Sequence, residues 1–268
     1  MKSGAKKRQF HIPVKLISAI VIIFLALVFI IGYSLRAIRD SDYFNIKDII
    51  ANEGNAIDLS YLKGNNIFSL DLINESRNIL DAYPGYSSIK LVRVLPNRIF
   101  ANFIKRKPVA LVKLYRYFLL DEGGVFFDPV NQQIEGLSLP VIVGLETKIP
   151  GARPGKAYNI RELVLALHII KEVKRERLLK DYRVKKINVA NIANTSMFMF
   201  YPPALRDARS AKAQGAPGEL EVRLGKDKIK DKIAILAGLV MGSNNGLANI
   251  KYIDLRFKEA VIKLKDVK

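Results

Sequence analysis

The sequence predicts an α+β protein: an N-terminal transmembrane helix, a small domain of three strands and two helices, and a mixed β-sheet domain with flanking helices. Three observations lead to this fold class. An uncharged stretch lies near the N-terminus, and strand and helix patterns alternate over the residues that follow it. From Pro108 onwards, short strand patterns separated by turn residues dominate.

Residues 16–35 form the predicted transmembrane helix. They carry no charge, and a helix of this length, at about 1.5 Å per residue, crosses the roughly 30 Å hydrocarbon layer. Residues 1–15 form a basic tail with five Lys and Arg, against three between 36 and 50, so the positive-inside rule predicts a cytoplasmic tail and an exported remainder. A cleaved signal peptide is the alternative, but its apolar stretch is typically about 7 to 15 residues. A buried soluble helix is a third reading, although no other segment is apolar enough to surround it.

The small domain is predicted from patterns between Phe44 and Lys105. Apolar residues at 44, 46, 49 and 50 indicate a first strand, and Asp58 before LSYL indicates a capped helical turn. Asp71 is the predicted N-cap of a helix over 72–83, which Pro84 and Gly85 end. Two strands, from Ser88 and from Arg98, are joined at Pro96 and Asn97 and predict a hairpin.

The larger domain begins with three strand patterns, at 109–115, 117–121 and 124–128. Asp121–Gly124, DEGG, predicts a hairpin turn because its two glycines tolerate positive φ. The remaining predicted elements are a short buried strand at 139–144, a helix from about Asn159 to Val173, strands near Val184, Ser196 and Glu219, a flexible loop at 201–218, and a helix from Lys226 to about Val240 ended by Gly238, Gly242 and GSNNG.

The last element predicts a hairpin at the edge of a sheet. Ile253, Leu255 and Phe257 share one strand face, and Tyr252, Asp254 and Arg256 share the other. A turn at Glu259 and Ala260 places Phe257 opposite Ile262, Leu255 opposite Leu264, Asp254 opposite Lys265, and Arg256 opposite Lys263. The final strand then has no successor to pair with its outer side, although closing the sheet is its commonest role.

Charge and composition limit the function classes. The formal net charge is +19, and removing the five basic residues of 1–35 leaves +14 on the exported part, which indicates an anionic partner without choosing among them. Lys171–Lys186 holds eight basic and three acidic residues. This run is either a solvated helix face or a surface for anionic lipid or cell-wall polymer. The chain has no cysteine, which excludes disulfides, thiolate metal sites and thiol nucleophiles.

Candidate catalytic groups do not converge. The two histidines, His11 and His168, are predicted on opposite sides of the membrane, and the adjacent carboxylates Asp121 and Glu122 diverge in a turn. No glycine-rich phosphate loop occurs. We therefore predict no catalytic, cofactor or metal site, no small-molecule substrate and no nucleic-acid partner.

The ordered set of motifs resembles the bacterial cell division proteins of the FtsQ/DivIB family. After the single span come FNIKDII, GNNIFSLD, VRVLPNRIFANFIKRKPVA, FLLDEGGVFF, LPVIVG and YIDLRF, in the family's order and over residues 16–264. The resemblance implies a POTRA domain at 43–112 and a β domain at 113–265, followed by the C-terminal end at 266–268. The expected departures from the family are the Pro/Ala-rich loop at 201–218 and a truncated end after Lys268. It also implies a bitopic protein of the bacterial cytoplasmic (inner) membrane at the division septum.

The resemblance further implies a non-enzymatic scaffold, without cofactors, that joins FtsB-like and FtsL-like bitopic proteins. The strand after YIDLRF is the family's main docking edge for FtsB, used by β-augmentation. Carried onto this chain, the partner-binding residues are Phe257, Lys258, Glu259, Ala260, Val261, Ile262, Lys263 and Leu264. Lys258, Lys263 and Lys265 would favour an acidic partner. The alternative is a membrane-anchored binder or enzyme acting on an anionic cell-wall polymer.

Overall fold

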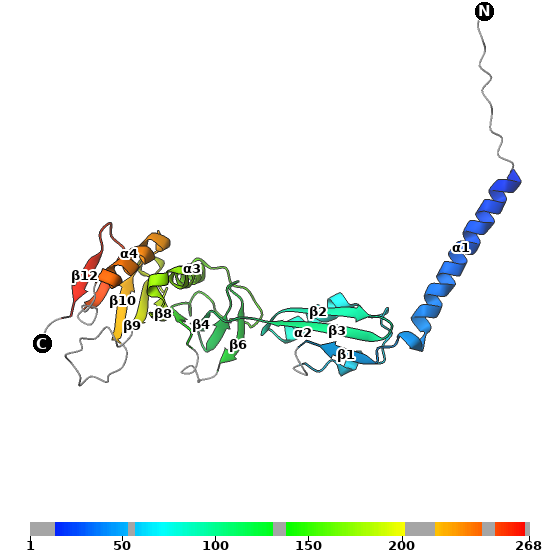
Figure 1. Cartoon of the computed structure of the whole chain (residues 1–268), viewed down its shortest axis with the longest axis horizontal. Helices are drawn as coiled ribbons and strands as arrows, with labels where there is room; N and C mark the ends of the chain where they lie inside the picture. Colours follow the sequence, from blue (N-terminus) through cyan, green and yellow to red (C-terminus); the bar gives the residue numbers. More distant parts are fainter. Residues whose placement is uncertain (1–13, 53–56, 131–137, 202–217, 243–249, 266–268) are drawn as a thin grey trace, which may run out of the picture. The chain divides into compact units, whose positions relative to one another are not determined.

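The computed structural model describes residues 14–52, 57–130, 138–201, 218–242 and 250–265 and has the predicted α+β architecture (Figure 1). Most of the predicted tail and loop, at 1–13 and 202–217, lies outside the described residues, as do 243–246 of GSNNG and 266–268.

The helices are α1 Val14–Asp40, α2 Leu72–Ala82, α3 Arg161–Arg175 and α4 Ile229–Gly242, with short 3-10 turns at Asp42–Phe44, Ser60–Leu62, Arg177–Leu179 and Ile192–Asn194. The strands are β1 Asp48–Ala51, β2 Tyr86–Val94, β3 Arg98–Lys105, β4 Ala110–Lys113, β5 Tyr117–Leu120, β6 Phe126–Val130, β7 Val141–Val143, β8 Arg183–Asn188, β9 Ser196–Tyr201, β10 Gly218–Arg223, β11 Ile250–Asp254 and β12 Val261–Leu264.

Helix α1 contains the predicted span. Ile17–Ala37 is long and apolar enough to cross a membrane, and every side chain from Ile17 to Ala37 is exposed. A soluble core helix would bury one of its faces, so these side chains fit a lipid environment instead. The helix continues to Asp40, five residues beyond the end of the predicted span at Leu35.

The described chain forms two compact units. The first contains the residues up to Ile79 together with Ser88–Phe103, and the second contains Leu80–Ser87 and the residues from Ile104 onwards. The first unit holds a three-stranded sheet in the order β1-β3-β2. Helix α2 packs on it: the backbone N–H of Leu91 in β2 donates to Ser76 Oγ of α2.

The predicted N-cap of α2 is confirmed, because Asp71 Oδ1 accepts hydrogen bonds from the backbone N–H groups of Ile73 and Asn74 at 3.1 and 3.2 Å. One other expectation for this unit needs correction: the first strand begins at Asp48, since residues 42–44 form a 3-10 turn. The helical turn predicted after Asp58 is present as the 3-10 helix Ser60–Leu62, and the Ser60 N–H donates to Asp58 Oδ1.

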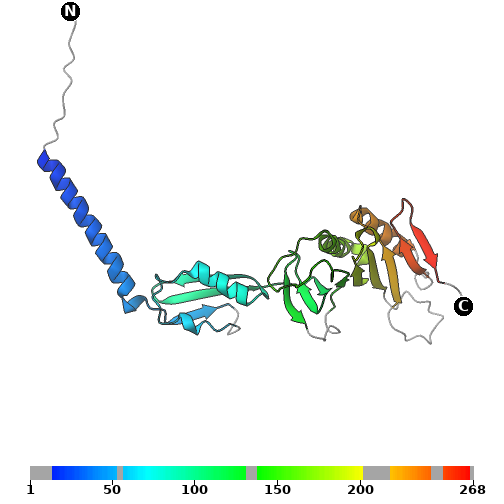
Figure 2. The same ribbon diagram turned by 180° about the vertical axis from the view of Figure 1, so that it is seen from behind.

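The second unit is a nine-stranded mixed sheet in the order β12-β11-β10-β9-β8-β7-β4-β5-β6. Helices α3 and α4 lie together over one face of it, as seen from both sides (Figures 1 and 2). The core between helices and sheet includes Leu163, Ile169 and Leu236 from the helices and Met197 and Val222 from the strands. Alternate strand residues point to the other face, which is why Glu219, Glu221 and Arg223 of β10 are less buried than Leu220 and Val222.

The two glycine-dependent predictions in this unit have different outcomes. The DEGG hairpin is confirmed between β5 and β6, with Gly124 at φ +78°, and Asp121 Oδ1 accepts from the N–H groups of Gly123 and Val125. Gly238 does not end α4, which runs on to Gly242. A glycine inside a helix costs only about 1 kcal/mol relative to alanine, and burial of Ile233, Leu236 and Val240 outweighs it.

Candidate partner-binding edge

One edge of the nine-stranded sheet, strand β6, is covered by a later segment of the chain. The N–H of Phe126 donates to the carbonyl of Lys156 at 3.2 Å, and the N–H of Gly155 donates to the carbonyl of Phe126 at 2.7 Å. The N–H of Tyr158 donates to the carbonyl of Gly124, and the Phe126 and Tyr158 rings lie 4.7 Å apart. Residues 155–158 therefore use outward backbone groups of Gly124 and Phe126, at the start of β6, with which another strand would pair.

The opposite edge, strand β12, is uncovered. Within the described residues it pairs only with β11, and all four of its residues are exposed. Val261, Ile262 and Leu264 are 47%, 41% and 59% exposed, and Phe257 in the preceding loop is 63% exposed. In a strand that only closes a sheet, the side chains on the core face are buried; here apolar side chains on both faces remain open to a partner.

The predicted register of the terminal hairpin is wrong. Ile253 lies opposite Ile262, Ile250 opposite Leu264, and Asp254 opposite Val261. The connection is a six-residue loop, Leu255–Ala260, and not a two-residue turn at Glu259 and Ala260. Of the eight residues predicted to bind a partner, Phe257–Ala260 therefore lie in the loop and Val261–Leu264 form the edge strand.

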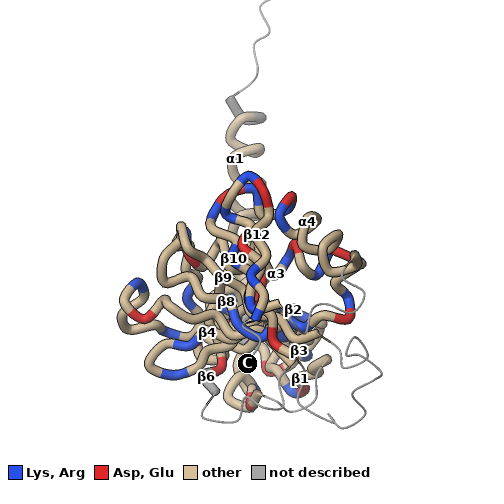
Figure 3. Tube along the Cα trace, turned by 90° about the vertical axis from the view of Figure 1, so that its left-hand side faces the viewer, with Lys and Arg blue, Asp and Glu red and all other residues tan. Residues whose placement is uncertain are grey.

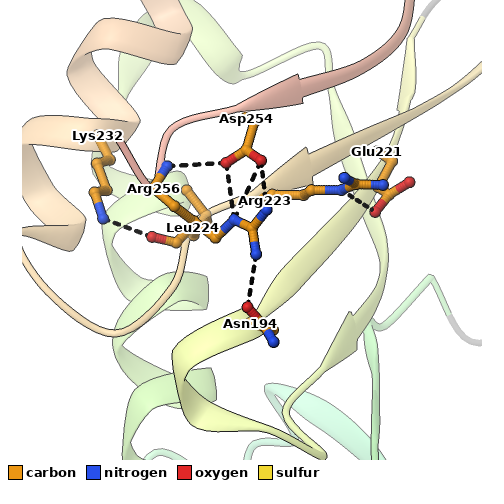
Figure 4. Close-up of polar contacts among 7 residues, drawn as sticks. All are labelled: Asn194, Glu221, Arg223, Leu224, Lys232, Asp254 and Arg256. Atoms are coloured by element: carbon orange, nitrogen blue, oxygen red, sulfur yellow. Dashed lines mark hydrogen bonds and ion pairs between the residues drawn. The ribbon is translucent and has the colours of Figure 1, made fainter. Parts of the chain in front are cut away.

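The loop is long because its first two residues are bound to neighbouring strands and turns. The N–H of Leu255 donates to the carbonyl of Arg223 in β10 at 2.8 Å, and the Leu255 side chain is buried. The guanidinium of Arg256 folds back onto Asp254 instead of facing Lys263 (Figure 4). The predicted pairs Arg256 with Lys263 and Asp254 with Lys265 consequently do not form; Lys263 faces Tyr252.

Asp254 and Arg256 form the central ion pair beneath the loop (Figure 4). Arg256 Nη2 lies 2.6 Å from Asp254 Oδ2 and its Nε lies 2.9 Å from Oδ1, while its backbone N–H also donates to Oδ1. Arg256 Nη1 donates to Asn194 Oδ1 at 2.6 Å. These bonds from the Arg256 side chain, more than any other cause, hold the pKa of the buried Asp254 carboxyl below its ordinary value and raise the pKa of Arg256.

Two further cations surround this pair. Arg223 binds Glu221 at 2.9 Å, and its guanidinium lies 3.8 Å from the centroid of the Tyr252 ring. Lys232 of α4 donates to the carbonyl of Leu224 at 2.6 Å (Figure 4), and burial lowers the pKa of its ammonium group. The strand ends that carry the loop are thus fixed by polar contacts, and the loop tip and β12 are left exposed.

Basic residues dominate this end of the sheet, as Figure 3 shows along β12 and the loop before it. Between Arg256 and Lys265 the sequence has four basic residues and one acidic residue, Glu259. Arg256 is paired with Asp254, and the exposed lysines of this segment include Lys258 and Lys263. The edge is therefore apolar and cationic.

The other candidate groups lie on or near α3. His168 is about half exposed and its Nε2 lies 3.7 Å from Glu172, which also binds Arg175 at 3.1 Å. A cleft of about 810 Å³ runs beside the helix, lined among others by Val164, Leu167, Lys171 and Lys174. Among the described residues no three His, Asp or Glu side chains are grouped to hold a metal ion. Asp121 serves the DEGG turn and binds Arg106 at 2.6 Å.

Comparison with known proteins identifies the family to which the chain belongs. The sequence profile described as "Cell division protein FtsQ/DivIB, C-terminal" matches residues 110–256, more than half of the chain. The chain belongs to the FtsQ/DivIB family. The matched region ends at Arg256, so it includes the Asp254–Arg256 pair and stops before the exposed loop tip and β12.

Curated relatives of the family cover the first unit as well. The cell division protein FtsQ of Geotalea daltonii is 25% identical over 240 residues, 86% of this chain and 80% of its own length. FtsQ of Myxococcus fulvus is 27% identical over 205 residues, 76% of this chain and 64% of its own length. FtsQ of Syntrophotalea carbinolica is 22% identical over 229 residues. With one apolar N-terminal helix, the chain is a single-pass membrane protein of a cell division family.

Proposed function

We propose that this chain is a non-enzymatic divisome scaffold that binds FtsB-like and FtsL-like bitopic proteins through its extracytoplasmic part, using β12 as a template for an added strand. The N-terminus is cytoplasmic, residues 43–112 are a POTRA domain, residues 113–265 are the β domain, and the protein works at the division septum. The observation that carries this proposal is the difference between the two sheet edges within the described residues: residues 155–158 bind the start of β6 from outside, whereas β12 pairs only with β11 and is exposed.

An added strand would gain from both the backbone and the side chains of β12. In an antiparallel ladder, alternate residues direct their N–H and C=O groups away from the existing neighbour, and an incoming strand pairs with these groups. Burying half-exposed side chains such as Val261, Ile262 and Leu264 contributes on the order of 1 kcal/mol each. Lys258, Lys263 and Lys265 add a preference for an acidic partner and speed its association.

The direct test is copurification of the full-length protein from dividing cells, comparing Phe257→Lys with Tyr115→Lys. Both parent side chains are 63% exposed in the second unit. Because the Tyr115 hydroxyl also donates to the Ala152 carbonyl at 2.7 Å, the fold of each variant is checked by its urea unfolding midpoint. We expect Phe257→Lys to lose a small bitopic partner and Tyr115→Lys to retain it. Retention of every partner by folded Phe257→Lys would refute the proposed edge.

Two cellular measurements test the rest of the proposal. Photo-crosslinking groups at each position from 257 to 264 should react with one small bitopic protein, and the absence of any product there in normally dividing cells would contradict strand docking. A reporter fused after Lys268 should be active outside the cytoplasm; activity only in the cytosol would overturn the orientation.

A second candidate function is binding or processing of an anionic cell-wall polymer. It is favoured by the cleft beside α3, where Lys171, Lys174 and Arg175 border apolar side chains. The two functions separate in the same assay: Lys171→Glu with Lys174→Glu should reduce sedimentation with purified cell wall if this second function holds, and Phe257→Lys should not.

A further inference from the structure

We propose that the first unit rests on the lipid head-group layer through an aromatic cluster made of Tyr43, Phe44 and Phe68. The occupant of this surface is the phospholipid bilayer that contains α1. The inference does not depend on which side of the membrane the unit occupies or on what binds β12, and its test can fail independently of theirs.

The three rings form one group, in which Tyr43 and Phe68 are exposed and Phe44, in contact with both, is half-buried. The Tyr43 and Phe44 ring centroids lie 5.1 Å apart, and those of Phe44 and Phe68 lie 5.2 Å apart, both edge to face. Tyr43 is 63% exposed and Phe68 is 41% exposed. Single exposed apolar side chains are normal on protein surfaces, but three rings in contact present a continuous apolar area with a phenolic hydroxyl.

Phe68 is remote from the span in sequence but not in the fold. Its loop is hydrogen-bonded to the residues that directly follow α1: the N–H of Ile67 donates to the carbonyl of Phe44, and the N–H of Ile46 donates to the carbonyl of Asn65, both at 2.9 Å. Asn66 Nδ2 also donates to the carbonyl of Ser41 at 3.3 Å. Residues 64–68 are therefore held against residues 41–46.

The short connection to the span allows this cluster to lie in the head-group layer. From Ala37, three more helical residues rise about 4.5 Å, and the 3-10 turn Asp42–Phe44 adds about 6 Å. With the joining residues, the path from the apolar span to Phe44 is at most about 15 Å, and a path that runs partly along the surface ends within the head-group layer, which is roughly 5 to 8 Å thick on each side. Aromatic side chains are enriched in this layer because it accepts both an apolar ring and a polar edge.

Basic side chains near the aromatic cluster also favour contact with the lipid head groups. Lys47 and Lys63 are exposed and lie one residue from Ile46 and Gly64, which are joined by a bond from the Gly64 N–H to the Ile46 carbonyl. Lysine side chains at this level attract anionic lipids. One carboxylate, the exposed Asp42 directly before Tyr43, accepts a hydrogen bond from Asn45. The two lysines outnumber it, so the cluster matches a bilayer that contains anionic phospholipid better than a neutral, fully apolar protein partner.

The experiment uses the absence of tryptophan from the sequence. Phe68→Trp and, as a control, Tyr83→Trp are made in the full-length chain and placed in nanodiscs of phosphatidylcholine and phosphatidylglycerol, with or without a head-group nitroxide lipid. Tyr83 is 42% exposed, close to the 41% of Phe68, but follows the other end of α2, about 16 Å along the helix. We expect quenching about twofold or more stronger at position 68, with emission shifted to the blue.

Equal quenching at positions 68 and 83 would overturn the proposal, and so would an emission maximum at 68 that does not change between detergent and nanodiscs. Should Phe68→Trp not fold, the lack of cysteine allows a second readout. Lys63→Cys and Lys90→Cys, both at exposed positions, are labelled with an environment-sensitive fluorophore. Stronger emission and nitroxide quenching at 63 than at 90 would support the proposal, and equal signals would refute it.

Discussion

Strands β6 and β12 end the same sheet in opposite ways. Strand β6 is short of free backbone groups because residues 155–158 bind its first residue from outside, and Asp128 interrupts it with φ +33°. Strand β12 is exposed on both faces, and among the described residues it pairs only with β11. Natural sheets usually cover, bend or charge their edges, and the proposed docking at β12 rests on this contrast with β6.

The two edges also differ in what fixes them. Strand β6 is held by ring contacts, since Phe126 lies between Phe118 at 5.7 Å and Tyr158 at 4.7 Å. Strand β12 is paired along its length with β11, and the polar contacts that fix this end of the sheet lie beneath it, in Asp254 and Arg256. In the proposed function, a partner strand would add to an edge that is already fixed, without refolding the sheet.

The largest expected effect on stability comes from opening the covered edge. Gly124→Ala places a Cβ 2.9 Å from the Tyr158 carbonyl at a φ of +78°, and we expect it to lower the unfolding free energy by about 2 kcal/mol. The same change should loosen residues 155–158 and promote self-association through β6. Urea unfolding and sedimentation of the full-length protein in detergent measure both effects.

The neighbouring glycine is the control for this change. At Gly123 an added Cβ would meet only Asp121 Oδ1 at 3.4 Å, and its φ is not positive, so Gly123→Ala should cost far less. Comparable losses in the two variants would mean that the turn tolerates no side chain at all and that the cover over β6 is not what Gly124 protects.

The second largest effect on stability is expected at the Asp254–Arg256 ion pair beneath β12. Asp254→Asn removes the charge that Arg256 binds, and because the Asp254 side chain is 5% exposed, we expect a loss of about 1.5 kcal/mol in unfolding free energy. Glu221→Gln is matched to it, since Glu221 also binds an arginine but is 27% exposed; a loss of about 0.5 kcal/mol or less is expected. Urea titration of both variants compares them, and equal losses would contradict the central role of Asp254.

The sequence predicted the elements of the fold well and the special contacts of the site poorly. Periodicity located α2, α3 and α4, and local rules located the Asp71 cap and the DEGG turn, because each depends on residues a few positions apart. The eight predicted site residues do lie together at one end of the sheet. Their hairpin register was missed because Arg256 is bound to Asn194, a contact across 62 positions that no local pattern contains.

One local signal for the longer loop was present. Asp254 and Arg256 are two residues apart and share a strand face, a spacing that allows an ion pair as readily as cross-strand contacts. The cover over β6 had no comparable signal, since residues 155–158 contribute backbone bonds and one isolated bridge, Val125 with Ala157, and form no strand pattern.

The third effect is the pH dependence of the same ion pair. The folded pKa of Asp254 is lowered, so its contribution is fully present above the unfolded value of about 3.9. It is lost as the pH falls through the lower folded value. Wild type should therefore be more stable than Asp254→Asn at pH 7, and the two should converge below about pH 4. Unfolding midpoints between these conditions test this, and a difference that persists at the acid end would mean that the carboxylate charge is not its cause.

The smallest effect on stability is expected at β12 itself. Lys263→Glu changes an exposed side chain opposite Tyr252, and surface changes of this kind usually stay within about 0.5 kcal/mol. Its effect on association should be far larger, because a reversed charge repels an acidic strand and slows its docking. Copurification and urea unfolding of the same preparation separate the two outcomes. A large loss of stability with normal partner recovery would mean that β12 serves the fold, and the contrast between the two edges would then lose its functional meaning.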